Sequence, residues 1–144
     1  FSHIYRYVLE TIEKPVVTVN EELDFARSYM FLQQIRYGGY LDFQVDLPSE
    51  VLDAWLPPLS LQVVLENAIK HNLVSDQQPL NIDIAHDEGY MVVTNNLQLK
   101  ISSGRSTGVG QENLIRRYQM ISRLVPSFRM AARQYQVRLP LIYE

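Results

Sequence analysis

The chain has 144 residues, 47% of them hydrophobic and 20% charged, which is the composition of one ordinary globular domain with a single core. Its net charge of −3 argues against a nucleic-acid-binding surface, which normally shows a basic excess. Because the chain has no cysteine, a disulfide framework, a thiolate nucleophile and a cysteine-ligated zinc site are all excluded.

The first elements predicted along the chain are two helices. Residues 1–11 have the apolar spacing of the end of an amphipathic helix. Thr18 and Glu21 then stand at the spacing of a capping box, in which each side chain accepts from the other residue's backbone amide. The helix that this box opens is expected to run to Tyr37 and to stop at the glycine pair that follows.

A strand and a further helix come next. Residues 41–46 alternate with period two and predict a strand that is half buried on one face. Trp55 is expected in the core. Pro57 and Pro58 favour the start of a helix. At helical spacing, the apolar face of this helix carries Leu61, Val64, Leu65, Ala68 and Ile69.

The polar side of that helix carries Glu66, Asn67 and Lys70. An amide oxygen is a suitable ligand for hydrated Mg²⁺, an ammonium group attracts phosphates, and a carboxylate can orient or deprotonate a nucleophile. These residues by themselves leave a second interpretation open. In it, Glu66 and Lys70 are a surface i,i+4 pair worth about 0.2–0.5 kcal/mol, and Asn67 has no role.

The second half of the chain begins with the clearest hairpin. Residues 81–85 and 90–94 are predicted to pair, because both segments alternate and a turn containing glycine joins them. This places His86 in the exposed turn, where no function is expected for it. No apolar run reaches the roughly 18 residues that a membrane-crossing helix needs.

A loop of small residues, 102–110, leads into a helix predicted over 111–124. Free amides and the helix dipole make such a helix start a ready anion site, although glycine there also serves backbone conformation alone. A second hairpin is predicted from 128–132 and 135–139. The resulting order predicts an α/β fold, a two-layer sandwich of a mixed, mainly antiparallel sheet with helices on one face.

Three motifs now stand in a fixed order: Leu-Glu-Asn-Ala-Ile-Lys-His at 65–71, Asn95-Asn96 at a strand end, and Gly-Val-Gly-Gln-Glu-Asn-Leu at 108–114. This order resembles the ATP-binding domain of sensor histidine kinases of the LytS type, within a superfamily that also includes gyrase and chaperone ATPases. The resemblance covers nearly the whole chain. It implies the Bergerat fold, with residues 1–14 as the end of a helical dimerisation and phosphoacceptor hairpin and residues 15–144 as the catalytic domain.

The resemblance also implies a role for each residue of the first motif. Asn67 would hold the Mg²⁺ that bridges the ATP phosphates, and Lys70 and His71 would lie near the phosphates or the ribose. Glu66 would be the catalytic group beside the reacting γ-phosphate.

The later motifs complete the implied nucleotide site. Asn95 would accept a hydrogen bond from the adenine amino group, where the family usually has an aspartate, and Asn96 follows it in the site. Gly108 and Gly110 would place backbone amides by the phosphates, and Asn113 would steady the turn of the following helix. Arg105 would belong to a lid over the nucleotide.

Two departures from the family pattern are visible. The usual Asp-x-Gly-x-Gly box is Asn-Asn-Leu-Gln-Leu at 95–99, with neither the acid nor the glycines. Losing a charged acceptor costs about 1–2 kcal/mol, so weaker adenine binding is expected. His3 is followed by Ile4 and Tyr5 and lacks the nearby Asn of the phosphoacceptor motif, so we expect the phosphoacceptor histidine to lie outside this chain.

The resemblance therefore implies a cytoplasmic catalytic domain that positions Mg·ATP for transfer of the γ-phosphoryl group to a histidine elsewhere in a longer protein. That protein would be a homodimer anchored in the bacterial inner membrane, with a response regulator as partner. Neither nucleic acid nor direct membrane contact by this chain is expected. The altered box at 95–99 favours an alternative, a degenerate kinase-like scaffold that binds nucleotide weakly or not at all. A gyrase- or chaperone-like ATPase is disfavoured, because such enzymes need further elements.

Overall fold

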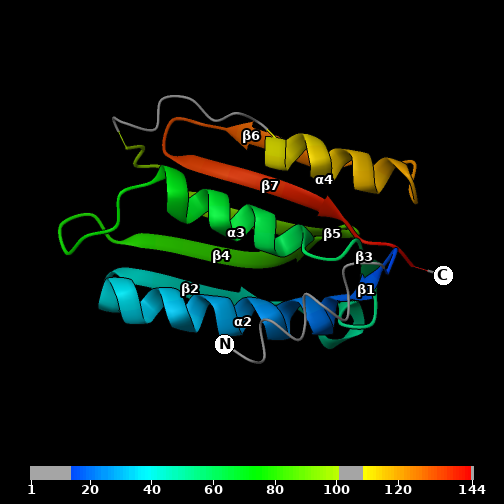
Figure 1. Cartoon of the computed structure of the whole chain (residues 1–144), viewed down its shortest axis with the longest axis horizontal. Helices are drawn as coiled ribbons and strands as arrows, with labels where there is room; N and C mark the ends of the chain where they lie inside the picture. The colour runs from blue at the N-terminus through cyan, green and yellow to red at the C-terminus, as the bar shows by residue number, and fades with distance from the viewer. Residues whose placement is uncertain (1–13, 101–108, 144) are drawn as a thin grey trace.

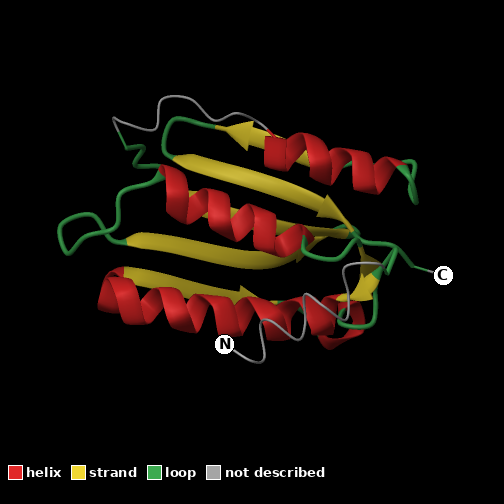
Figure 2. Cartoon of the chain, viewed as in Figure 1, coloured by secondary structure: helices red, strands yellow, loops and turns green. Residues whose placement is uncertain are grey.

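The computed structural model describes residues 14–100 and 109–143, so the helix predicted over 1–11 lies outside the described residues. Five strands form the main sheet in the order β2 (Leu41–Asp46), β4 (Leu80–Asp87), β5 (Tyr90–Asn96), β7 (Gln134–Pro140) and β6 (Ser127–Met130). The β2–β4 pair is parallel and the other pairs are antiparallel. Three helices, α2 (Val19–Tyr37), α3 (Ser60–His71) and α4 (Val109–Gln119), cover one face (Figures 1 and 2). The predicted two-layer sandwich is confirmed.

The capping box at the start of α2 is present as predicted. The Thr18 hydroxyl accepts from the Glu21 backbone amide at 3.1 Å, and the Glu21 carboxylate accepts from the Thr18 amide at 3.1 Å. The helix ends at Gly38, whose φ of 66° lies in the region that glycine adopts without strain. Local sequence therefore sets both ends of α2.

The start of α3 depends instead on a contact with α2. Leu59 precedes the helix with a φ of 66°, and the backbone amides of Leu59 and Leu61 donate to the Glu22 carboxylate at 3.0 and 3.2 Å. Glu22 lies on α2 and is only 1% exposed. Because the first amides of a helix have no intrahelical partner, this buried carboxylate caps α3 and ties it to α2.

The alternation of the central strands sets which side chains face the helices. On β5, Met91 and Val93 point into the core, and Asn95 continues the same face two residues later. Asn95 stands opposite Ile82 of β4 and Tyr135 of β7. The sheet therefore presents one buried amide to the helix layer at the end of its central strand.

Trp55 corrects one prediction. It lies in a small two-stranded sheet of β1 (Val17–Thr18) and β3 (Trp55–Leu56), where it is half-buried rather than in the core. Its backbone also pairs with Ile142. Successive side chains of a strand point to opposite faces, so Leu56 enters the core at 0% exposure and Trp55 points away from it.

The first hairpin also differs from the prediction, because its strands are longer and its turn is only Glu88-Gly89. His86 is therefore a half-buried residue of β4, and its Nε2 accepts from the Gly89 amide at 3.2 Å.

Helix α4 ends at Gln119, earlier than the predicted end near residue 124. After Gln119 the chain turns, because the carbonyl of Tyr118 accepts from the backbone amides of Ile121 and Ser122. Across 14–100 and 109–143, no helix has the length and apolarity needed to span a bilayer.

Candidate functional site

The start of α4 lies against the middle of α3. A Cβ placed on Gly110, in the first turn of α4, would stand 3.5 Å from Cγ1 of Val63. Asn67 and Lys70 follow Val63 by one and two helical turns, so they lie on the same side of α3. The structure thus brings the glycine-containing start of α4 to the side of α3 that carries the candidate metal ligand.

Asn67 and Lys70 have no partner among the side chains and backbone groups that the structure describes. Asn67 is half-buried and Lys70 exposed, and within residues 14–100 and 109–143 neither side chain makes a hydrogen bond or an ion pair. A polar group withdrawn from water without a hydrogen bond costs free energy. The amide of Asn67 is therefore available to a polar ligand.

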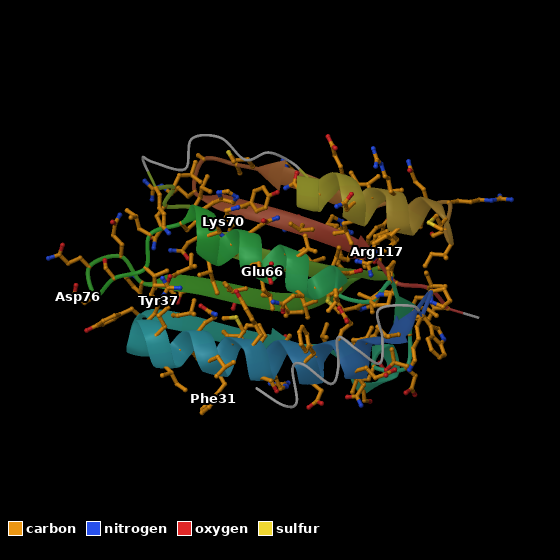
Figure 3. All side chains as sticks on the ribbon, viewed as in Figure 1. Phe31, Tyr37, Glu66, Lys70, Asp76 and Arg117 are labelled. Carbon is orange, nitrogen blue, oxygen red and sulfur yellow. The ribbon has the colours of Figure 1, made fainter. Side chains whose placement is uncertain are left out.

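Glu66 precedes Lys70 by one helical turn, on the edge of α3 that faces Tyr29 of α2. It is exposed and accepts a hydrogen bond from Nε2 of Gln62 at 2.8 Å. The pKa of Tyr29 on α2 is raised to about 12, first by burial and then by the negative charge of Glu66. Figure 3 shows Glu66 and Lys70 on α3, and within the described residues they form no ion pair. The simple surface pair is therefore absent.

Three basic side chains gather at the C-terminal end of α3. The pKa of His71 lies below its ordinary value, first because the ring is partly buried, and then because Lys70 and Lys100 are close enough to repel its positive charge. The backbone amide of Lys100 donates to the carbonyl of His71 at 3.0 Å, which holds the two segments together. The positive charge here comes from Lys70 and Lys100, and it suits a polyanion.

This arrangement predicts how stability depends on pH. Since the folded state disfavours the charged form of His71, the unfolded chain binds the proton more readily. The free energy of unfolding should therefore fall as the pH drops below about 6.5, the ordinary histidine value. Urea denaturation at pH 7.5 and 5.5 measures this loss, and His71→Gln should remove part of it. An equal loss in that variant would contradict the prediction.

Asn95 lies near the end of β5, opposite Ile82 of β4. It is 3% exposed, and its Nδ2 donates to the carbonyl of Asn96 at 2.8 Å, which fixes the orientation of the amide and leaves Oδ1 as the atom open to a ligand. On the neighbouring strand, the Tyr135 hydroxyl accepts from Nε2 of Gln111 in α4 at 2.7 Å. Burial raises the pKa of Tyr135, and the Gln111 bond partly offsets this. No motif in the sequence singles out Gln111 or Tyr135 as a site residue.

Asn96 faces the opposite way and holds the fold together. Its Oδ1 accepts from the Asn81 amide at 2.7 Å, and its Nδ2 donates to the Pro79 carbonyl at 3.0 Å and to Oε1 of Gln98 at 3.1 Å. These bonds occupy its polar atoms, so the side chain of Asn96 joins β5 to the start of β4.

The remaining predicted residues are placed less fully. Arg105 and Gly108 lie outside the described residues, and Asn113 is exposed on α4. In the described part of the chain, no group of three or more histidine, aspartate or glutamate side chains could hold a metal ion. A Mg²⁺ held mainly by phosphates needs few oxygen ligands from the protein. The side-chain oxygen of Asn67, which has no partner among the described residues, suits this role.

Comparison with known proteins gives three results. A family model described as histidine kinase matches residues 1–41. The sensor histidine kinase/phosphatase LytS of Staphylococcus aureus strains Mu50 and N315 is 31% identical over 84 residues, which are 58% of this chain and 14% of LytS. Two nucleotide-free structures of the catalytic domain of histidine kinase ThkA match with TM-scores of 0.55 and 0.54, at 14% and 13% identity. They cover 90% and 89% of this chain, and 97% and 99% of theirs.

Proposed function

This chain is related to the LytS sensor histidine kinases and has the fold of a histidine kinase catalytic domain, and from this we propose that it binds Mg·ATP and positions it for phosphoryl transfer. The chain spans about one seventh of the curated relatives that it matches, at 14% of their length. The activity and partners of the whole protein are accordingly part of the proposal.

The observation that carries the proposal is the position of Asn67. Its half-buried amide has no partner within residues 14–100 and 109–143, and it shares one side of α3 with Lys70. The start of α4 at Gly110 packs against that side. An amide oxygen for Mg²⁺, an ammonium group for phosphates and the amides of a helix start are the groups that a metal-bound triphosphate requires.

Two further features support a nucleotide rather than a simple anion. Lys70 and Lys100, the two lysines beside His71, extend the positive charge beyond a single phosphate. Asn95, at the buried end of β5, offers an acceptor where a base could lie against the sheet. In this proposal, the phosphates of the nucleotide lie by Lys70 and Lys100, and its base lies by Asn95, between the sheet and the helices.

Phosphoryl transfer needs little covalent chemistry from the protein, since positioning and charge neutralisation supply most of the rate. In our proposal, Asn67 would hold a Mg²⁺ that supplies positive charge to the phosphates, Lys70 would neutralise them further, and the exposed carboxylate of Glu66 would act beside the γ-phosphate. The acceptor is a histidine of the same longer protein, in a homodimer whose catalytic domains face the cytoplasm and which passes the phosphoryl group to a response regulator. We further propose that residues 1–14 belong to the dimerisation and phosphoacceptor part of that protein, and residues 1–13 lie outside the described residues.

Titration calorimetry with Mg²⁺ and a non-hydrolysable ATP analogue, AMP-PNP, tests the proposal. We expect the wild-type chain to bind, and Asn67→Ala and Lys70→Ala each to weaken binding about tenfold, because each removes a group that contacts charge. Asn81→Ala and Arg27→Ala, which change exposed residues away from the site, should bind like the wild type. In a longer polypeptide with the phosphoacceptor, Glu66→Gln should retain binding and lose transfer.

The second candidate, a kinase-like scaffold without turnover, is favoured by the residues at 95–99, which lack the acid and glycines of the family box. The same titration separates the two candidates. If folded wild-type protein releases no heat at millimolar nucleotide, the catalytic proposal is wrong and the scaffold remains.

A further inference from the structure

The chain that follows β5 is tied to the end of α3 and to the start of β4 by one glutamine side chain. Nε2 of Gln98 lies 2.7 Å from the carbonyl oxygens of Leu73 and Gln78 and 3.2 Å from that of Pro79. A side-chain amide has two N–H groups, and each of the two shorter bonds uses one of them. The Pro79 carbonyl shares one of these N–H groups in a longer, weaker contact. Gln98 thus joins three segments that are distant in sequence.

The backbone of Gln98 is held by the same end of α3. Its amide donates to Oδ1 of Asn72 at 2.8 Å, and its carbonyl accepts from the Leu73 amide at 2.9 Å. Asn72 is 3% exposed, and its Nδ2 donates to the carbonyl of Ala68 at 2.9 Å. These bonds attach Gln98 to the last turn of α3, which also carries Lys70.

On its other side, Gln98 reaches the strand that carries the base acceptor. Its Oε1 accepts from Nδ2 of Asn96 at 3.1 Å, and the carbonyl of Asn96 accepts from Nδ2 of Asn95 at 2.8 Å. A continuous set of hydrogen bonds thus runs from the last turn of α3, through Gln98 and Asn96, to the amide of Asn95.

We propose that Gln98 is a positioning residue of the nucleotide site, which holds the Asn95 acceptor at a fixed place and orientation relative to Asn67 and Lys70. The inference rests on the proposed nucleotide binding and goes further, because it makes the site selective for the base. With Nδ2 of Asn95 directed to the Asn96 carbonyl, Oδ1 is left to accept from the 6-amino group of adenine. The 6-oxo group of hypoxanthine or guanine would place a second acceptor against it.

The experiment compares Gln98→Met, which keeps a long side chain but removes its hydrogen bonds, with Gln134→Met on an exposed position of β7. Calorimetry is run with Mg·AMP-PNP and with Mg·ITP, the inosine triphosphate complex. We expect the wild type to prefer AMP-PNP about tenfold or more, Gln98→Met to bind AMP-PNP about tenfold more weakly, and its preference to fall to about threefold or less. Gln134→Met should match the wild type.

The preference between the two nucleotides separates positioning from stability. If Gln98→Met weakens both nucleotides equally, or changes neither, the inference is wrong and the proposed nucleotide binding stands. If the wild type binds neither nucleotide, both fall together. Circular dichroism checks that each variant is folded. Should Gln98→Met not fold, Gln98→Asn, whose shorter amide cannot span the same three segments, is held to the same criterion.

Discussion

Replacing Glu22 by alanine should lower the free energy of unfolding by about 3 kcal/mol, because hydrogen bonds to a charged group contribute about 1.5–3 kcal/mol each. The buried carboxylate accepts from the amides of Leu59 and Leu61, which no group within α3 can satisfy. Its negative charge at the start of α3 also complements the helix dipole. The variant would leave both amides buried without this partner.

Urea denaturation measures this loss, and two further variants define its cause. Glu22→Gln keeps the size of the side chain and one oxygen acceptor, so it should lose about half as much. Glu50→Ala changes an exposed carboxylate in a short 3₁₀ turn and should stay within about 0.5 kcal/mol of the wild type. If Glu22→Ala loses no more than Glu50→Ala, the capping role is wrong.

The features that could be predicted from the sequence depend on neighbours in the chain. The capping box of Thr18 and Glu21 needs only a spacing of three residues, and the alternation of 81–85 and 90–94 needs only the pleat of a strand. The order of these elements along the chain predicts the sandwich with helices on one face, and the family motifs agree with it.

The features that could not be predicted depend on contacts between distant segments. Glu22 meets Leu59 across 37 residues, and nothing local marks it as the cap of another helix. Gln98 and Asn72 are ordinary polar residues in the sequence, yet they join across 26 residues. Trp55 is predicted in the core, but it lies in a two-residue strand that pairs with Ile142. No local pattern in the sequence predicts so short a strand or its distant partner.

Replacing Asn95 by aspartate should change stability and nucleotide affinity in opposite directions. In the free protein, a carboxylate oxygen would stand where Nδ2 now lies, 2.8 Å from the carbonyl of Asn96, at a position that is 3% exposed. A donor would become an acceptor facing another acceptor, which should cost about 2 kcal/mol of unfolding free energy. With an adenine nucleotide bound, the same charge gains a stronger hydrogen bond from the 6-amino group, and affinity should rise about tenfold.

Thermal melting with and without saturating Mg·AMP-PNP measures both effects, since a ligand stabilises the folded state according to its concentration relative to the dissociation constant. We expect Asn95→Asp to melt lower than the wild type when free and to gain more on addition of nucleotide. Asn81→Asp, on the exposed side of β4, should change neither quantity. If Asn95→Asp melts lower while its gain from nucleotide stays at the wild-type value, then Asn95 supports the sheet and does not contact the base. In that case the base end of the site would have to be assigned to other residues.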